Sequence, residues 1–491
     1  MTKTQRWLIR ISCTTLLAGL IADPAGAQSF RKGPYLMFRG DNTRMDVLWQ
    51  TTSASTDTIR WGDEFSNVIG TDTSTPYGSD FQHRYELTQL MPGTMVIYEV
   101  TVGAVTVVDS FRTAPPDSQR SIKFIVYGDT RTNVSMHDRV ADSILSQVNR
   151  DSGFRSILLS VGDLVSDGQQ ESYWTSELFN HSWPGLQSML AGLPYQSCRG
   201  NHEGNGILFG KYFPYPYIGG MYWSFDYGPA HFAVVDQYTA YGTGSAQLQW
   251  LDRDLAGSAK RWKFILLHEP GWSAGGGHAN STGVQQYIEP LCEKYHVPVV
   301  FGGHNHYYAR ARIDGAGGFS VYHITTGGGG APLYTPQTGQ PGIVTATSAN
   351  HFCTVEIEDD TLLLFRAIAT DGRLIDSFSV PVPAAPSTGV ADASPFSTGY
   401  SLHPAYPNPF NPGTSIRFVL PVESRVVARI FDILGREVAT ISEGILTAGE
   451  HTARWIPRDM PSGVYFCRLE ASPHYRPVRS FTLTRTLILS K

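Results

Sequence analysis

The sequence has 491 residues, a length that predicts about three domains. Charged residues make up 16% and hydrophobic residues 41%, and 49 glycines with 30 prolines favour a turn-rich, strand-rich architecture. These values exclude a disordered chain, a coiled coil and a highly charged scaffold, and the net charge of −5 argues against nucleic acid as a partner.

Residues 1–27 have the pattern of a secretory signal peptide. Basic residues precede an apolar run over residues 11–22, and small residues at 25–27 form a cleavage pattern before Gln28. The apolar run is too short to span a bilayer, although a membrane anchor or a buried helix is the alternative. Later stretches are not apolar for long enough to span one, so we expect no transmembrane segment in the mature chain.

Residues 28–117 have the pattern of a small antiparallel β-sandwich. Apolar and polar residues alternate over 45–49 and 95–100, and no helical period interrupts them. The run from Leu90 to Val100 resembles the fibronectin type III signature. We therefore expect a fibronectin III-like β-sandwich at this end of the chain.

Residues 118–380 change to an alternation of strands and helices, which predicts a buried α/β core. The expected strands include 123–127, 156–161, 264–267 and 297–301, and an amphipathic helix is expected over 137–149. Residues 381–400 are rich in Pro, Ala, Ser and Thr and have the composition of a linker. Residues 401–491 again alternate like strands and have glycines at the expected turns.

Polar side chains of the kind that bind metals follow the strands of the α/β region. In chain order they are Asp129, Asp163, Asn201, His268, His304 and His306. Ligands of open α/β sheets bind at the carboxyl ends of the strands, so these side chains should meet at one edge. Taken singly, each has an ordinary alternative, such as a turn, a helix cap or an unrelated surface histidine.

The chemistry of this set favours two ions. Carboxylate, amide and imidazole ligands together suit Fe, Zn or Mn, as divalent or trivalent ions, more than Ca or Mg. The ligands are too many for one tetrahedral ion, whereas a pair of ions bridged by one carboxylate fits them.

The ordered motifs resemble those of the calcineurin-like metallophosphoesterases, most closely the purple acid phosphatase branch. They are GDTR at 128–131, GDLVSDG at 162–168, GNHE at 200–203, His268, and GHNH at 303–306. The resemblance covers roughly residues 30 to 370. It implies a central α/β metallophosphoesterase sandwich, with the fibronectin III-like domain before it.

The resemblance also implies a role for each residue. Asp163 would bridge the ions; Asp129 and His306 would hold the first, and Asn201, His268 and His304 the second. His202 would bind the phosphate and help to protonate the leaving oxygen. His278 stands at the spacing of a further phosphate-binding histidine of the plant enzymes, with a mobile loop histidine as the alternative.

The sequence departs from the family at two positions near the first ion. Ser166 stands where the purple branch has the tyrosine that gives the colour, so we expect a colourless enzyme. Arg131 stands where the wider superfamily has a histidine, which leaves water, Asn133 or His137 as the missing ligand. Arg131 would clamp a phosphate oxygen, or else form an ordinary salt bridge or remain solvated.

Residues 401–491 resemble the C-terminal sorting domains of the type IX secretion system, which have an immunoglobulin-like fold. The resemblance rests on the HPAYPNPFNP run at 403–412 and on LGREV at 434–438. It implies the secretion machinery as a partner and export through the periplasm of a Gram-negative bacterium, with release or attachment at the cell surface. An ordinary accessory β-sandwich is the alternative.

Together these features predict a multidomain secreted phosphatase. We expect it to hydrolyse small phosphomonoesters by attack of a metal-bound hydroxide. A phosphodiesterase using the same site and a non-catalytic surface binding protein that kept the fold are the alternatives. His231 lies in an expected strand, as a core residue or as a support for the ligands, and His296, His323 and His351 show no ligand spacing. The aromatic loops 212–217 and 238–243 either select the substrate or pack internally.

Overall fold

The computed structural model describes two compact units, Met1–Pro386 and Ser387–Lys491. In the first unit it describes residues 28–62, 68–315, 319–337 and 339–383. In the second it describes residues 401–403, 405–420, 424–447, 449–457, 460–473 and 481–490. The expected signal peptide and most of the expected linker lie outside the described residues.

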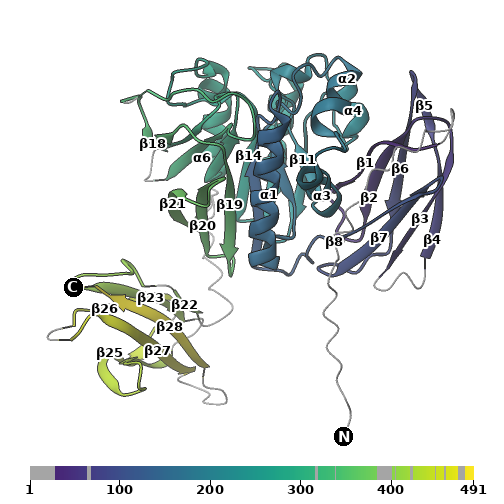
Figure 1. Cartoon of the computed structure of the whole chain (residues 1–491). Helices are drawn as coiled ribbons and strands as arrows, with labels where there is room; N and C mark the ends of the chain where they lie inside the picture. The colour runs from purple at the N-terminus through teal and green to yellow at the C-terminus, as the bar shows by residue number, and fades with distance from the viewer. Residues whose placement is uncertain are drawn as a thin grey trace, which may run out of the picture. The chain divides into compact units, whose positions relative to one another are not determined.

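The first unit begins with two antiparallel sheets that share one core (Figure 1). One sheet has the order β1 (Phe30–Met37), β2 (Met45–Thr51), β6 (Asp80–Leu87) and β5 (Thr75–Tyr77). The other has the order β4 (Val68–Thr73), β3 (Thr56–Gly62), β7 (Met95–Val102) and β8 (Val105–Arg112). Their alternating apolar residues, such as Trp49 and Tyr98, are fully buried. The strand-rich pattern is therefore observed, while the fibronectin type III assignment stays a prediction.

The central region contains two mixed sheets. The six-stranded sheet has the order β11 (Tyr195–Ser197), β10 (Leu158–Ser160), β9 (Ile122–Tyr127), β19 (His351–Glu358), β20 (Leu362–Ala369) and β21 (Leu374–Pro381). The seven-stranded sheet has the order β12 (Trp223–Tyr227), β13 (Ala230–Val234), β14 (Trp262–Leu266), β15 (Val299–Gly302), β17 (Ser320–Thr326), β16 (Tyr308–Asp314) and β18 (Ile343–Thr347). The strands β9 to β11 are parallel to one another, and so are β13, β14, β15 and β17.

The two sheets pack face to face through aromatic side chains. Phe124 of β9 contacts Phe232 and Phe264 of the other sheet edge-on, with ring centroids 5.3 and 5.4 Å apart. Successive residues of a strand point to opposite faces of the sheet. Ala233 and Ile265 therefore belong to a second core, on the outer face of the seven-stranded sheet. This alternation accounts for a layered α/β core.

Helices cover the outer faces. On the seven-stranded sheet, α5 (Ala246–Gly257) and α6 (Glu289–Tyr295) supply residues of the outer core. On the other side, α1 (Val134–Arg150) packs with α3 (Pro184–Gly192) (Figure 1). The short helices α2 (Glu171–Tyr173) and α4 (Ile207–Tyr212) lie in the loops that follow β10 and β11. The helix expected over 137–149 is thus longer at its start, because the Asn133 side chain accepts the Met136 N–H and caps it.

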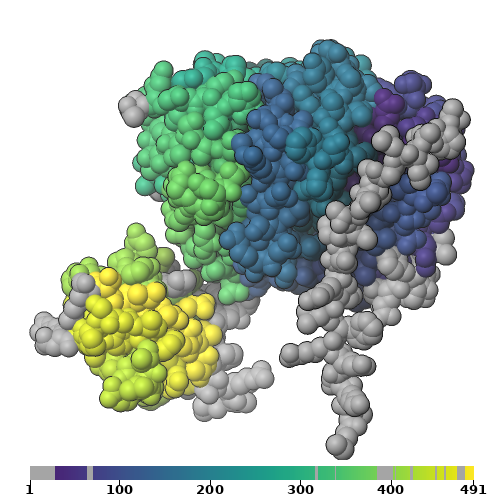
Figure 2. Space-filling model, in the orientation of Figure 1, coloured from purple at the N-terminus to yellow at the C-terminus, as the bar shows by residue number. Residues whose placement is uncertain are grey.

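The strand-rich region and the central region form one packed body. The Tyr35 ring lies 4.7 Å from that of Phe179, and its hydroxyl donates to the Tyr212 carbonyl at 2.7 Å. Figure 2 shows the two regions meeting as a continuous surface, purple against blue and teal. The second sheet also contributes, since the Tyr98 hydroxyl donates to the Ala191 carbonyl at 2.9 Å.

The second unit has a core of its own between two antiparallel sheets. One has the order β22 (Ser401–Leu402), β23 (Thr414–Leu420) and β26 (Gly449–Trp455). The other has the order β25 (Glu437–Leu446), β24 (Ser424–Phe431), β27 (Gly463–Pro473) and β28 (Phe481–Leu489). The immunoglobulin-like assignment stays a prediction. Within the described part of the chain, none of the helices has the length and apolar character that crossing a membrane requires.

Candidate metal centre

The loops after five strands bring the expected side chains together. Asp129 follows β9, Asp163 follows β10 and Asn201 follows β11, all in the six-stranded sheet. His268 follows β14, while His304 and His306 follow β15 of the other sheet. Because these strands run parallel within each sheet, their carboxyl ends lie at the same edge. The structure therefore places the candidate ligands where the sequence predicts them.

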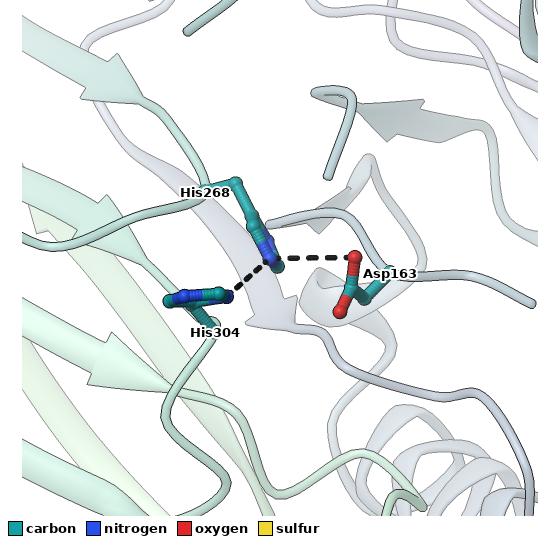
Figure 3. Close-up of side chains that lie close together, drawn as sticks. All are labelled: Asp163, His268 and His304. Carbon is teal, nitrogen blue, oxygen red and sulfur yellow. Dashed lines mark hydrogen bonds and ion pairs between the residues drawn. The ribbon is translucent and has the colours of Figure 1, made fainter. Parts of the chain in front are cut away.

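One cluster, which we call the His268 group, consists of Asp163, His268 and His304 (Figure 3). His268 Nε2 lies 3.3 Å from Asp163 Oδ1 and 3.2 Å from His304 Nδ1. Asn201 Oδ1 lies 3.1 Å from the same nitrogen. His268 Nδ1 donates to the Val161 carbonyl at 2.7 Å, which directs Nε2 toward the other members of the group.

The other cluster, the His306 group, consists of Asp129, Asp163 and His306. His306 Nε2 lies 3.6 Å from Asp129 Oδ1, and His306 Nδ1 donates to the Pro332 carbonyl at 2.7 Å. Within each group the ligand atoms lie within 4.8 Å of one another. Asp163 is the member common to both groups, the position that a bridging carboxylate requires.

The electrostatics of the two groups fit cations. Burial, followed by the charge of Asp163, raises the pKa of Asp129 to about 8. Burial would also raise the pKa of Asp163, but His268 and His202 hold it well below its usual range. Burial lowers the pKa of His304 to about 3 and that of His306 to about 4, so both rings are neutral donors. Burial would lower the pKa of His268 as well, but the charge of Asp163 raises it to about 10, so a metal ion at its Nε2 would take the place of a proton. Buried carboxylates beside imidazoles form a donor set that a metal ion compensates.

The backbone at this edge is strained and closely packed. Asp129, Asp163 and His304 have positive φ angles of 56°, 54° and 64°. Such conformations persist only where the surroundings enforce them, and they concentrate at functional sites. A Cβ on Gly303 would lie 2.2 Å from Asp129 Oδ2, and one on Gly162 would lie 2.7 Å from the Gly200 nitrogen. The glycines of the motifs thus let the loops approach the ligands.

Two buried glutamates that the sequence interpretation missed hold these loops. Glu203 accepts the N–H groups of Asp163, Leu164 and Gly200 at 3.0, 2.8 and 2.7 Å. Glu177 accepts the Ser166 hydroxyl at 2.6 Å and its N–H at 2.7 Å, together with the Thr132 N–H at 3.2 Å. Glu203 could have been found as the last residue of GNHE, whereas no motif marks Glu177.

His202 and His278 both lie beside the candidate ligands. His202 Nδ1 donates to the Ser166 carbonyl at 2.6 Å, and its Nε2 lies 3.8 Å from Asp163 Oδ2. The His278 ring stacks on His304 with centroids 3.9 Å apart. Its backbone N–H donates to Asn305 Oδ1 at 2.7 Å, so the loop is fastened at this residue.

Two of the three options for the missing ligand have contacts in the structure. Asn133 caps α1, and His137 is buried with its Nε2 3.0 Å from the Tyr127 hydroxyl. Both side chains thus have other partners, and which of the three options supplies the missing ligand stays a prediction. The Ser166 hydroxyl is likewise engaged by Glu177.

Arg131 reaches into the His306 group itself. Its Nε lies 3.4 Å from Asp163 Oδ2, and its Nη2 lies 3.4 Å from His306 Nε2. The salt bridge expected as an alternative is present, while the expected contact with a phosphate oxygen stays a prediction.

The other histidines have partners elsewhere. His231 lies between Asp226 and Asp254, His323 faces Glu289, and His351 contacts the Thr326 hydroxyl. The His296 ring packs on Phe319. In the aromatic loops, Tyr212 and Tyr215 are buried, while Tyr238 donates to Glu269 at 3.2 Å.

Two family models match the chain. Residues 122–308 match the calcineurin-like phosphoesterase model, and residues 404–477 match the secretion system C-terminal sorting domain. The chain carries a calcineurin-like phosphoesterase domain. All the candidate ligands, with His202, His278 and Arg131, lie inside this phosphoesterase domain. The C-terminal match likewise confirms the resemblance to the type IX sorting domains.

Curated relatives are purple and other acid phosphatases. Purple acid phosphatase 13 of Arabidopsis thaliana is 32% identical over 192 residues, 34% of this chain and 35% of that protein. Purple acid phosphatase 15 of the same plant is 25% identical over 286 residues, 50% of this chain and 52% of that protein. Acid phosphatase type 7 of Mus musculus is 23% identical over 406 residues, 71% of this chain and 90% of that protein. The chain thus spans about a third and about half of the length of the two plant relatives.

A solved structure shows the same fold around the phosphoesterase domain. Purple acid phosphatase PPD1 from yellow lupin (Lupinus luteus) seeds superimposes with a TM-score of 0.60 at 17% identity. The match covers 72% of this chain and 74% of that one. It confirms the expected resemblance to the purple acid phosphatases at the level of the fold.

Proposed function

We propose that this chain is a secreted phosphatase that hydrolyses phosphomonoesters with two metal ions. The observation that supports it is the pair of donor groups sharing Asp163, set at the carboxyl ends of the strands of a phosphoesterase domain. Because relatives of this chain are named as acid phosphatases, we expect phosphomonoesters as its substrates. The C-terminal sorting domain supports the type IX machinery as partner and a secreted or cell-surface location.

The residues that would hold the ions divide between the two groups. Asp129 and His306 would hold one ion, and His268, His304 and Asn201 the other, with Asp163 shared. Bound ions at such a site activate water and neutralise the charge that develops on the phosphoryl group. The chain itself contributes ligand orientation, since carbonyl groups fix the ring nitrogens of His268 and His306.

The remaining residues would act on the substrate. The Ser166 carbonyl accepts from His202 Nδ1, so the Nε2 of this ring faces the donor groups. With a second proton on Nε2, the ring would donate to a phosphate oxygen and would then give that proton to the leaving oxygen. The stacked His278 and the Arg131 guanidinium offer further donors to the phosphate.

The test combines metal analysis with two substrates. We expect the full chain to bind metal and to hydrolyse p-nitrophenyl phosphate faster than bis-p-nitrophenyl phosphate. Asp163→Ala and Asn201→Ala should lose turnover and metal, whereas Asp371→Ala, which removes an exposed carboxylate, should retain both.

Other results would favour one of the alternative functions or overturn the assignment of the site. Preference for the bis ester would favour the phosphodiesterase alternative. Absence of metal together with absence of activity on both esters would favour the surface binding protein. Full activity in Asp163→Ala would overturn the assignment of the site.

A further inference from the structure

His278 stands on a loop that packs closely against its neighbours. We call residues 273–280 the His278 loop, and three consecutive glycines precede its histidine. The Ser273 N–H and hydroxyl both donate to Asn280 Oδ1, at 2.8 and 2.7 Å, and so join the two ends of the loop. A Cβ on Gly276 would lie 1.9 Å from a carbonyl oxygen of the segment that follows β17. The absence of side chains thus lets the loop lie against that segment.

Asn305 fastens this loop to the loop that carries two of the candidate ligands. It stands between His304 and His306 in the chain, and it is fully buried. Its Oδ1 accepts the His278 N–H at 2.7 Å, and its Nδ2 donates to the His278 carbonyl at 3.4 Å. One side-chain amide therefore pairs with both backbone groups of the histidine. A Cβ on Gly277 would lie 2.4 Å from the same Oδ1, so the contact also depends on the glycine at this position.

The contact with Asn305 matters because the His278 side chain itself is exposed. Its ring stacks on His304, with centroids 3.9 Å apart and 26° between the planes. Its Nε2 lies 3.4 Å from the hydroxyl of Tyr334, whose own ring stacks on His306. A buried amide thus fixes the backbone of a residue whose ring stays open to solvent. A ring fixed in this way needs little further ordering when it binds an anion.

We infer that Asn305 is a positioning residue, which holds His278 beside the donor groups before a phosphate binds. This inference rests on the proposed function, in which His278 donates to the phosphate. Asn305 would hold no ion itself, since both polar atoms of its side chain face His278. It affects phosphate binding through the place that it gives to the histidine. Loss of the amide would free the loop, and phosphate binding would then have to order it again.

The test uses inorganic phosphate and p-nitrophenyl phosphate as probes of the full, metal-loaded chain. His278→Ala should weaken inhibition by phosphate and raise KM by about tenfold, the usual effect of losing a hydrogen bond to a charged group. Asn305→Ala should act in the same direction. The double variant should be no weaker than His278→Ala alone, because two changes that act through one group do not add. By contrast, kcat and the metal content from elemental analysis should stay within about twofold in all three variants.

A second variant tests the same contact from the side of the loop. Gly277→Ala pushes a methyl group against Asn305 Oδ1 and changes no candidate ligand, so its effects should match those of Asn305→Ala. Hydrogen exchange followed by mass spectrometry reports on residues 273–280 in the metal-stripped chain, where activity plays no part. The loop should exchange faster in both variants than in the wild type. Asn411→Ala, at an exposed position of the second unit, and Gly257→Ala are the matched controls and should change neither measurement.

The outcomes separate this inference from the proposed function. Multiplied effects in the double variant, wild-type phosphate inhibition in His278→Ala, or unchanged exchange in Asn305→Ala and Gly277→Ala would overturn the inference and leave the phosphatase proposal standing. Loss of metal in Asn305→Ala together with wild-type phosphate inhibition in Gly277→Ala would do the same, since Asn305 would then support the ligands instead. A wild-type chain that hydrolyses neither p-nitrophenyl phosphate nor its bis ester would overturn both.

Discussion

Gly303 shows how a single absent side chain shapes the metal centre. It lies between β15 and His304, where a Cβ would come within 2.2 Å of Asp129 Oδ2 and 2.8 Å of Val161. Real Cβ atoms do not approach oxygen so closely, so either Asp129 or the loop would have to move. The His304 N–H, which donates to Asp129 at 2.9 Å, would be displaced by the same movement.

We therefore expect Gly303→Ala to reduce metal binding and to destabilise the phosphoesterase domain by about 1–3 kcal/mol, the usual range for overpacking. Gly257→Ala is a matched control, because no atom lies within 4 Å of its added Cβ at the end of α5. Urea unfolding and elemental analysis of both variants provide the measurement. Equal stability and metal content in the two would show that Asp129 is free to shift.

At the scale of elements, a charged histidine joins β12, β13 and α5. His231 of β13 lies 2.7 Å from Asp226 of β12 and 2.8 Å from Asp254 of α5. Burial alone would lower its pKa, but the two carboxylates raise the pKa to about 9. The protonated ring is thus the form that the folded state stabilises.

The pH dependence follows from that direction. Because the folded pKa lies above the usual 6.5, the stabilisation is complete below pH 6.5 and is lost as the pH rises through 9. His231→Gln should therefore lower the free energy of unfolding, relative to the wild type, by about 2–3 kcal/mol more at pH 6 than at pH 10. Urea unfolding at both values tests this, and NMR titration of Asp254→Asn should show the His231 pKa falling toward 6.5. A His231 resonance that titrates near pH 6.5 in the wild type would refute this role of the two carboxylates.

Some features of the strands and loops could be predicted from the sequence, and others could not. Strand ends could be predicted, because apolar runs stop at Gly-Asp or Gly-His pairs, so the convergence of Asp129, Asp163 and His304 followed. The strained φ angles at Asp129 and Asp163 could not be predicted, since only the packing of loops from two sheets enforces them. Glu177 was missed for a similar reason: its contacts with Thr132 and Ser166 join three loops that no motif connects.

At the scale of the whole molecule, the first two predicted regions pack as one unit. Lys32 of β1 is fully buried, and its ammonium lies 2.7 Å from Glu171 at the start of α2. Tyr35 packs against Phe179 and Phe213 of the phosphoesterase domain. Composition alone could not predict that the two regions pack together, because the residues on both sides of the contact are of types common in any core or ion pair. Residues 387–491 form a unit of their own, while the linker expected over 381–400 stays a prediction.

This division predicts different results for the two ends of the chain. A chain ending at Pro386 should keep the phosphatase kinetics of the full chain, because the second unit has its own core and contributes none of the candidate site residues. Removing residues 28–117 should instead give an insoluble or inactive protein, since it uncovers the aromatic surface around Phe179 and leaves Glu171 without Lys32.

Kinetics on p-nitrophenyl phosphate and differential scanning calorimetry test both deletions. The full chain should show two thermal transitions, of which the chain ending at Pro386 retains one. Full activity without residues 28–117 would show that the strand-rich region is a separable module, and loss of activity on removing 387–491 would show that the second unit supports the site.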